Sequence, residues 1–491
     1  MKKTLHIQPN DNVIVALEPL YAGETAAGIT LLEDIPSGHK FACLSIAAGQ
    51  PVIKYGQPIG HATVSIQPGQ WVHNHNLKTS LSGTLDYQYN PVSNPIEARP
   101  GSRPVMAYRR ENGTIGIRNE LWVIVTVGCI GDTARNIVNT FRQRHPLDDI
   151  DGIFTFNHPF GCSQMGQDHQ NTVKILQDIV THPNAGGVLV LGLGCENNQL
   201  KLFYDSLEQI NPQRVRCLNC QDVENEVQSA VELLEQIYQA MRHDRREVCD
   251  LSEFSFGLKC GGSDGYSGIT ANPLLGRFSD ILVRYGANIV LSEVPEMFGA
   301  EQLLMNRAAD RATFDKLVAM INRFKDYFLS NHQVVYENPS PGNKAGGITT
   351  LEEKSLGCIQ KAGTSQINDV LDYGEKIQKK GVSLVYGPGN DLVSTTTLGA
   401  CGCQVVLFTT GRGTPFGGFI PTYKIATHSE LAARKPHWID FNAGILTEGV
   451  TLDEAAEQLV EDLIAVLEGK KTRNEISDLR SIAIFKQGVI C

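Results

Sequence analysis

The sequence predicts an α/β protein in which a small β-rich module precedes two domains with mainly parallel sheets. Short β-type runs, broken by Gly, Pro and Asn, fill residues 1–90. From about residue 105, apolar strand-like runs alternate with helical stretches, which is typical of a parallel α/β sheet. A chain of 491 residues also has room for about three domains.

Composition narrows the class of protein. Hydrophobic residues make up 42% of the chain and charged residues 20%, as in soluble globular proteins. The net charge of -10 argues against a nucleic-acid partner, because phosphate binding needs a basic surface. Residues 1–10 lack the apolar core of a signal peptide, and no apolar run approaches the roughly 20 residues of a membrane helix. We therefore expect a cytoplasmic protein without a membrane partner, whose twelve cysteines are reduced.

In the N-terminal module, the strand candidates are Asn12–Leu17 and Ala62–Ile66. Four prolines then fall within residues 91–104, and this density predicts an extended linker.

Residues 105–245 are predicted to form the first α/β domain. Each of four strands is followed by a helix, with the strands at Leu121–Val127, Gly152–Phe156, Gly187–Leu191 and Arg214–Leu218. The charged segment Arg242–Asp250 is expected to be a surface connector.

Residues 250–491 are predicted to form the C-terminal α/β domain. Its strand candidates are Phe254–Leu258, Ile289–Leu291, Val382–Tyr386, Gln404–Phe408 and Trp438–Phe441. The amphipathic segment Leu452–Leu467 is expected to be a closing helix. Tyr336–Gly363 is rich in Gly, Pro and Ser, and such a long loop in a compact domain is usually functional.

Three cysteines follow predicted strands in consecutive units. Open α/β sheets bind ligands at the carboxyl ends of their strands, so Cys129, Cys162 and Cys195 are candidates to converge there. Three such thiols can hold an iron–sulfur cluster with one iron open. The alternative is that they are ordinary packing residues, because cysteine is among the most buried residue types. The glycine-rich loops of Cys162 and Cys195 suit the approach of a ligand.

Two histidines are candidate metal ligands. His73 and His75 follow the strand-like segment Gln70–Val72, and residues two apart on an extended chain point to the same face. Two imidazoles can then bind one metal ion, with a third ligand from elsewhere. The alternative is a pair of exposed histidines in a turn.

Cations and polar loops supply candidates for binding an anionic ligand. Lys40 and Lys54 lie beside possible turns and can pair with a carboxylate as point charges, although most lysines are solvated surface residues. Arg412, in the loop Thr409–Pro415, can bind a carboxylate through two hydrogen bonds. Lys344 lies in the polar loop Asn338–Gly347.

Two further segments follow strands in the C-terminal domain. Lys259 ends a strand in the glycine turn up to Asp264, and Asn272 opens a helix whose free N–H groups can face an anion. Glu293 and Glu296 follow the next strand as acid–base groups, metal ligands or ordinary loop charges.

Together, these segments resemble the altronate and galactarate dehydratase family over nearly the whole chain. The matching stretches are Lys54–Gly56, Val72–Asn76, Phe160–Ser163, Gly192–Glu196, Lys259–Asp264, Thr270–Pro273, Ser292–Glu296, Asn338–Gly347, Leu351–Lys354 and Thr409–Pro415. The resemblance implies a SAF-type β-clip domain at the N-terminus, followed by the family's two larger domains. It also implies an iron(II)-dependent hydro-lyase, with manganese as a substitute, that removes water from a hexonic or hexaric acid.

The first fifty residues and the length look more like altronate than galactarate dehydratases. The expected reaction is the conversion of D-altronate to 2-dehydro-3-deoxy-D-gluconate in hexuronate breakdown, by a homodimer whose partner is this small sugar acid. The alternatives are galactarate dehydration, elimination of sulfite from sulfolactate, and binding of a sugar acid without catalysis. Sulfolactate lyases are typically split into two subunits, whereas this chain is fused.

Such a dehydration needs a base for the α-proton, positive charge for the enediolate and an acid for the leaving hydroxyl. Our sequence-based hypothesis assigns these roles to a set of candidate residues. Lys259 or His158 is the base, and His73 and His75 bind iron, with Cys162 and Cys195 as alternative iron ligands. The substrate is bound by Lys40, Lys54, Arg412, Asn272 and Lys344.

Overall fold

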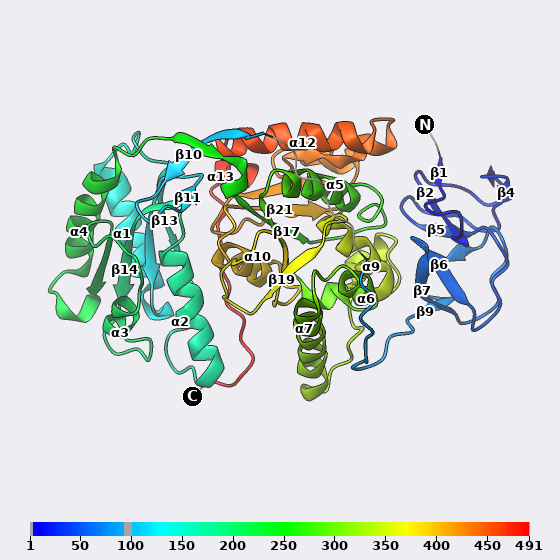
Figure 1. The fold of residues 1–491 in the computed structure, drawn as a ribbon, viewed down its shortest axis with the longest axis horizontal. Helices are drawn as coiled ribbons and strands as arrows, with labels where there is room; N and C mark the ends of the chain where they lie inside the picture. Colours follow the sequence, from blue (N-terminus) through cyan, green and yellow to red (C-terminus); the bar gives the residue numbers. More distant parts are fainter. Residues whose placement is uncertain (1–2, 93–100, 491) are drawn as a thin grey trace.

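The computed structural model describes residues 3–92 and 101–490 and divides into three parts (Figure 1). The N-terminal module lies at one end, the C-terminal domain in the middle and the remaining α/β domain at the other end. This arrangement confirms the predicted fold class. Within the predicted linker 91–104, residues 93–100 lie outside the described residues.

The N-terminal module is built from short antiparallel strands. One sheet has the order β1-β2-β5-β8 and the other β6-β7-β9, with a separate β3-β4 hairpin. The strands are β1 (Thr4–Leu5), β2 (Val13–Ala16), β3 (Thr25–Ala26), β4 (Ile29–Thr30), β5 (Lys40–Ala42), β6 (Pro51–Lys54), β7 (Gln57–Ala62), β8 (Trp71–Val72) and β9 (Leu77–Lys78).

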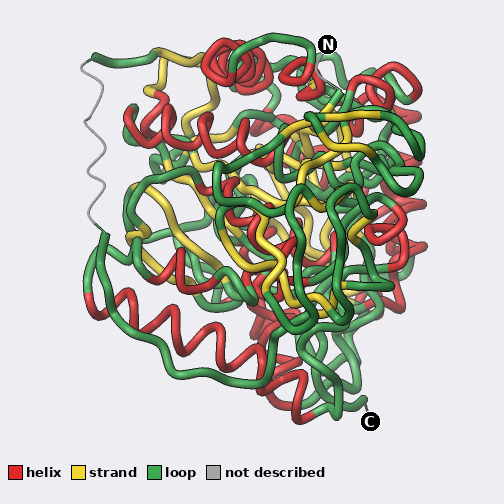
Figure 2. The backbone as a smooth tube through the Cα atoms, turned by 90° about the vertical axis from the view of Figure 1, so that its right-hand side faces the viewer, coloured by secondary structure: helices red, strands yellow, loops and turns green. Residues whose placement is uncertain are grey.

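The prediction for 12–17 falls on β2, but the one for 62–66 is wrong. There the strand ends at Ala62, and Ile66 makes only an isolated bridge to Ile46. Viewed from the module's side of the molecule, its strands lie in front of the larger domains (Figure 2).

The second domain has a four-stranded parallel sheet in the order β13-β12-β14-β15. Its elements are β12 (Glu120–Val125), α1 (Gly131–Arg144), β13 (Gly152–Phe156), α2 (Gly166–Val180), β14 (Ala185–Gly192), α3 (Leu200–Asp205), β15 (Val215–Asn219) and α4 (Glu226–Met241). Buried side chains of α1 and α4 pack on one face of the sheet, and those of α2 and α3 on the other.

One small sheet was not predicted from the sequence. The segment 242–250 was expected to be a surface connector, but it contains β16 (Glu247–Asp250), which pairs with β10 (Pro104–Arg109). β10 also pairs with β11 (Ile115–Gly116). Glu247 and Val248 are exposed, so β16 lacks the alternation of buried and polar residues by which strands are recognised.

The C-terminal domain has a seven-stranded parallel sheet in the order β19-β20-β18-β17-β21-β22-β23. The strands are β17 (Ser255–Cys260), β18 (Asn288–Leu291), β19 (Ile367–Leu371), β20 (Gly381–Val385), β21 (Val405–Thr410), β22 (Thr422–Ala426) and β23 (Phe441–Asn442). β19 and β22 were not predicted from the sequence, and the predicted strand 438–441 reaches β23 only at Phe441. Trp438 instead packs against a small cluster that includes Leu431.

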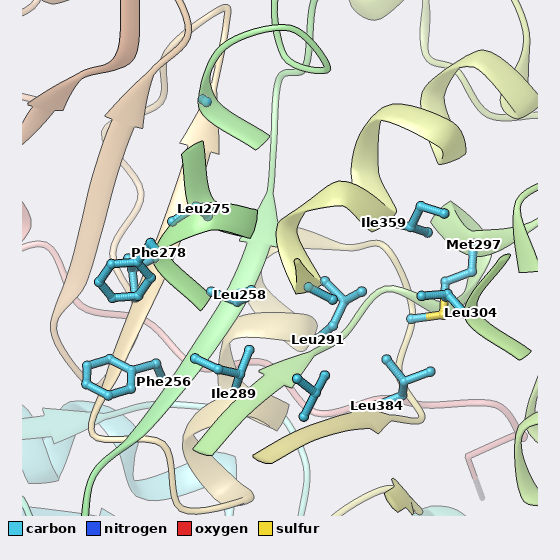
Figure 3. Packing of buried hydrophobic residues seen from close by; sticks show 14 of the residues in the cluster. Phe256, Leu258, Leu275, Phe278, Ile289, Leu291, Met297, Leu304, Ile359 and Leu384 are labelled. Carbon is cyan, nitrogen blue, oxygen red and sulfur yellow. The ribbon is translucent and has the colours of Figure 1, made fainter. Parts of the chain in front are cut away.

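Helices of the C-terminal domain cover this sheet. They include α5 (Ala271–Arg284), α6 (Glu301–Met305), α7 (Arg311–Ser330), α10 (Asp391–Ala400), α11 (Ser429–Arg434), α12 (Leu452–Leu467) and α13 (Arg473–Ile476). Phe278 of α5 packs against Phe256 of β17, beside Leu258 and Ile289 (Figure 3). No helix of the described residues is long and apolar enough to cross a bilayer.

The segment 336–363, predicted as a loop, is largely helical. It forms α8 (Pro341–Ala345), α9 (Leu351–Cys358) and a 3-10 turn at Ile359–Ala362. Every residue of α9 is buried, so this helix has no solvent face and no amphipathic period to reveal it. α9 packs against β7 of the N-terminal module, which places it between the module and the sheet.

Candidate active site

The carboxyl edge of the seven-stranded sheet contains a topological switch point. From β17 the chain proceeds through α5 to β18 on one side, whereas β21 lies on the other side of β17. Open α/β sheets bind ligands where the chain diverges in this way. The loops after β17 and β21 meet there, with the backbone N–H of Arg412 donating to the carbonyl of Gly262 at 2.8 Å.

Lys259 lies at this edge and is fully buried. Its Nζ lies 2.6 Å from Asp391 Oδ1, 3.0 Å from Ser394 Oγ and 3.1 Å from Glu293 Oε1. Burial alone would lower the pKa of Lys259, but the carboxylates of Glu293 and Asp391 outweigh it and raise that pKa. At neutral pH Lys259 is therefore an ammonium, which suits stabilisation of negative charge better than the predicted role as a base.

Two cysteines and a glutamate meet beside Lys259. The Sγ atoms of Cys260 and Cys358 lie 3.0 and 3.2 Å from Glu296 Oε2 and 3.3 Å from each other. Among the described residues, they form the one group of three potential metal ligands within 4.8 Å of one another. Cys260 and Cys358 are 98 residues apart, so spacing in the sequence gave no sign of this cluster.

Two lysines surround the cluster. Lys354 Nζ lies 2.7 Å from Glu296 Oε1, and Lys361 Nζ donates to Cys260 Sγ at 3.0 Å. These ammonium groups stabilise negative charge on the carboxylate and the sulfur. A divalent cation bound to the three ligands would have to compete with them.

The two glutamates after β18 have opposite pKa shifts. Burial, reinforced by the charge of Glu296, raises the pKa of Glu293. Burial also disfavours ionised Glu296, but Lys354 and Lys361 overcome this effect and lower its pKa to about 2. Glu293 also adopts φ 73°, the left-handed region that a residue with a side chain rarely enters. Neighbouring carboxyl groups whose pKa values are shifted in opposite directions are typical of acid–base sites.

Two cations at this edge have no ion-pair partner among the described residues. Arg412 is exposed on the loop after β21, and Lys344 is half-buried on α8. Asn343 Nδ2 donates to the carbonyl of Ser263 at 2.8 Å, which fixes α8 to the loop after β17. The buried Ser263 Oγ has no hydrogen-bond partner within residues 3–92 and 101–490. Free cations beside an unsatisfied hydroxyl suit a hydroxylated carboxylate ligand.

Lys40 and Lys54 have a different setting from the one predicted. Both bind Glu353 of α9, with Nζ–Oε distances of 2.8 Å, and all three side chains are about 1% exposed. Lys40 also donates to Thr349 Oγ1 at 2.6 Å. These lysines connect the N-terminal module to the C-terminal domain, and their charge is already paired.

One carboxylate cannot compensate both lysines equally. Burial dominates at Lys40 and lowers its pKa to about 8. At Lys54, burial is outweighed by Glu353 and Tyr55, which raise the pKa. For Glu353 itself, burial is overcome by the two ammonium groups, which lower its pKa to about 2.

The stability of this junction is expected to fall in acid. The pKa of Glu353 drops from 4.5 to about 2 on folding, so its contribution is complete above pH 4.5 and is lost as the pH falls toward 2. The shift corresponds to about 3 kcal/mol. Thermal midpoints measured between pH 5 and 2.5 should therefore fall less steeply in Glu353→Gln than in the wild type. Equal slopes would contradict the assignment.

His73 and His75 do not lie on an extended segment. Asn76 and Leu77 donate their backbone N–H groups to the carbonyl of His73, so the segment is a turn and the premise of strand alternation is wrong. His73 Nδ1 lies 3.1 Å from Thr349 Oγ1, whereas His75 is exposed. Among the described residues, these two histidines belong to no group of three potential metal ligands within 4.8 Å of one another.

His158 and Asn272 have structural partners. His158 belongs to the second domain, where Nε2 bonds to the carbonyl of Val125 and Nδ1 accepts from Phe160. Neither nitrogen is left for a substrate, so His158 is not a suitable base. The buried Asn272 donates to the carbonyl of Gly357 and accepts from Thr409, which holds α9 to β21.

A cavity of about 780 Å³ lies elsewhere. It opens at the amino ends of β14 and β15, and two of the arginines that line it, Arg110 and Arg214, both pair with Asp244. Cys162 and Cys195 are exposed at the opposite, carboxyl edge of that sheet.

A SAF-type module docked on the switch point of an α/β domain with an acid–base cluster defines a class of hydro-lyases. Three family models match the chain in order. They describe an altronate/galactarate dehydratase SAF domain (residues 2–80), a D-galactarate dehydratase/altronate hydrolase second domain (107–242) and a D-galactarate/altronate dehydratase C-terminal domain (251–490).

Full-length relatives agree with these models. The chain is 53% identical to an altronate dehydratase of Escherichia coli over 99% of both chains, and 50% identical to one of Bacillus subtilis over the whole of both. It is 34% identical to the galactarate dehydratase (L-threo-forming) of E. coli over 95% of this chain and 92% of that one. The chain belongs to the D-galactarate/altronate dehydratase family, which confirms the predicted family and the predicted hydro-lyase activity on a sugar acid.

Proposed function

We propose that this enzyme dehydrates D-altronate to 2-dehydro-3-deoxy-D-gluconate in hexuronate breakdown. The observation that carries the proposal is the identity of 50–53% with two altronate dehydratases along the entire chain. Galactarate is the second candidate substrate, supported by the 34% identical relative. A cytoplasmic homodimer is our proposal for location and assembly. The eleven described cysteines are free, as expected in a reducing compartment, and light scattering would test the dimer.

The proposed substrate site is the switch point between β17 and β21. Arg412 and Lys344 bind the carboxylate, because they are cations without partners among the described residues. Ser263 Oγ hydrogen-bonds to a substrate hydroxyl and so gains the partner it lacks among these residues. The proposal gives a structural role to Lys40, Lys54 and Asn272. They hold α9 in place and do not contact the substrate.

The proposed chemistry begins with transfer of the C2 proton to the carboxylate of Asp391, which is one-third exposed and lies 2.6 Å from Lys259. The Lys259 ammonium stabilises the enediolate that forms. Glu293, whose pKa is raised by burial and by Glu296, is the proposed acid: in its protonated form it gives its proton to the C3 hydroxyl, which leaves as water. The resulting enol becomes the 2-keto product.

We propose that iron(II), with manganese as a substitute, binds to Cys260, Glu296 and Cys358. Two sulfurs and a carboxylate suit a borderline-soft divalent ion, and their ligand atoms lie within 4.8 Å of one another. When bound, such an ion supplies Lewis-acid polarisation of a substrate oxygen. This assignment replaces the pair His73 and His75.

Removing the metal is expected to abolish activity. Chelator-treated enzyme should regain turnover with iron(II), and Glu296→Gln should bind iron more weakly by at least about tenfold, in line with losses at metal ligands and their supports. The control His75→Ala should bind iron like the wild type. Full activity without metal, or loss of iron binding in His75→Ala alone, would contradict the assignment.

The identity of the substrate is tested by measuring turnover of a panel of aldonic and aldaric acids under anaerobic conditions with iron(II). D-Altronate should give the highest kcat/KM for formation of a 2-keto acid. A higher kcat/KM for galactarate would make that acid the substrate. Binding of these acids without turnover by any metal-loaded preparation would indicate a binding protein and overturn the proposal.

A further inference from the structure

Exposed cysteines gather at one place in the second domain. Of the eleven described cysteines, the three that are exposed are Cys129, Cys162 and Cys195. Cysteine is among the most buried residue types, so three exposed thiols at one edge are unusual. They belong neither to the switch point nor to the cluster around Glu296. That site lies in the middle domain, whereas β14 and α1 lie at the end of the molecule away from the N-terminal module (Figure 1).

The sheet order brings the three cysteines together. Cys162 follows β13, Cys129 follows β12 and Cys195 follows β14, and these strands are direct neighbours with β12 in the centre. All are parallel, so the three loops leave the same edge. With about 4.8 Å between adjacent strands, the loops cover roughly 10 Å.

Hydrogen bonds hold these loops against one another. The loop after β12 bonds to the loop after β13 through Gly128 N and Phe160 O at 2.8 Å. The loops after β13 and β14 are joined by Asn198 N to Gly161 O at 3.0 Å and by Ser163 N to Asn197 Oδ1 at 2.7 Å. The three cysteines are thus carried by one interlocked surface.

The spacing argues against a single metal ion. Ligands of one tetrahedral ion have sulfurs within about 4 Å of each other, given metal–sulfur bonds of about 2.3 Å. Among the described residues, the cysteine trio is not a group of ligands within 4.8 Å of one another. A multi-iron cluster accepts sulfurs that are farther apart, because each sulfur binds a different iron.

The surroundings suit an anionic cluster. Helix α1 starts two residues after Cys129 and α2 four residues after Cys162, and their N-cap residues, Ile130 and Met165, make no side-chain cap hydrogen bond. Helix N-termini favour negative charge. Gln164, 4% exposed, accepts from Gly161 N through Oε1, while its buried Nε2 has no partner among the described residues. Amide donors of this kind hydrogen-bond to cluster sulfurs.

We propose that Cys129, Cys162 and Cys195 bind a [4Fe–4S] cluster, with the fourth iron left to a non-protein oxygen ligand such as water or a carboxylate. Each thiol loses its proton on binding an iron. This site goes beyond the proposed function, since the dehydration assigned to the switch point does not use it.

The test is anaerobic reconstitution of the full chain with equal amounts of iron(II) and iron(III), sulfide and dithiothreitol, followed by desalting; two ferrous ions, two ferric ions and four sulfides make up the expected [4Fe–4S] core with charge 2+. About four irons and four acid-labile sulfides per chain are expected, with broad visible absorbance. Each of Cys129→Ser, Cys162→Ser and Cys195→Ser should lose most of this signal, and the triple variant all of it. Because these side chains are exposed, the variants should keep the wild-type thermal midpoint. The control Cys217→Ser, half-buried in β15, should keep the cluster.

Cys260→Ser separates this site from the proposed catalytic one, because it should weaken binding of a single iron(II) but retain the labile sulfide. Absence of labile sulfide in the reconstituted wild type would overturn the cluster. The cluster would also be overturned if the triple variant kept the labile sulfide and the visible absorbance. The same holds if the three cysteines bound a single zinc or iron ion without sulfide. A wrong substrate assignment changes none of these readouts.

Discussion

Lys259→Met is expected to lower kcat by about 100- to 1,000-fold, the usual effect of removing one group that stabilises a developing oxyanion. The substitution keeps an unbranched side chain but removes the ammonium that lies between Glu293 and Asp391. KM should change little, because Arg412 and Lys344, the residues proposed to bind the carboxylate, are unchanged. Steady-state kinetics with D-altronate and iron(II) would measure both constants.

A matched control separates catalysis from the loss of a buried charge. Lys325 on α7 is also fully buried, and its Nζ lies 2.8 Å from both Glu301 and the hydroxyl of Tyr87. Lys325→Met should destabilise the fold to a similar degree but leave kcat per folded enzyme close to the wild type. An equal loss of kcat in both variants, or an unchanged kcat in Lys259→Met, would remove Lys259 from the reaction.

The parts of the fold with a regular sequence pattern could be predicted. The amphipathic helix 452–467 has the bounds expected for it, and the four apolar strands of the second domain alternate with helices as predicted. Elements without that signal were missed. α9 is buried on all sides, and β16 is short and exposed, so neither carries a periodic pattern.

The candidate site could be predicted only in part, because the roles of its residues depend on partners that are far away in the sequence. Lys40 and Lys54 were singled out as cations, but Glu353, some 300 positions away, turns them into a structural pair. Lys259 was selected as a base, and the charges of Glu293 and Asp391 instead favour the ammonium. Cys260 and Cys358 are the last residues of β17 and α9, and they meet because the ends of these two elements come together in the fold. Sequence spacing carries no information on contacts of this kind.

Glu353→Gln is expected to have the largest effect on stability. It leaves two lysines, each about 1% exposed, without a counter-charge, and breaking a buried ion pair in this way costs about 3–5 kcal/mol. The interaction that is lost lies at the junction between the N-terminal module and the C-terminal domain. Differential scanning calorimetry should show a lower midpoint, and limited proteolysis should release the module earlier.

The neighbouring Glu352 provides the matched control. It is also buried on α9, but it accepts hydrogen bonds from Thr79 and Ser80 of the module and has no lysine partner in the described part of the chain. A glutamine at 352 keeps an acceptor oxygen, so Glu352→Gln should cost only about 1 kcal/mol. If both substitutions lower the midpoint equally, the contact area of α9 rather than the charge of Glu353 holds the module. A restored midpoint in Glu353→Gln combined with Lys40→Met would instead support charge pairing, because that pair of changes removes one of the two uncompensated ammonium groups.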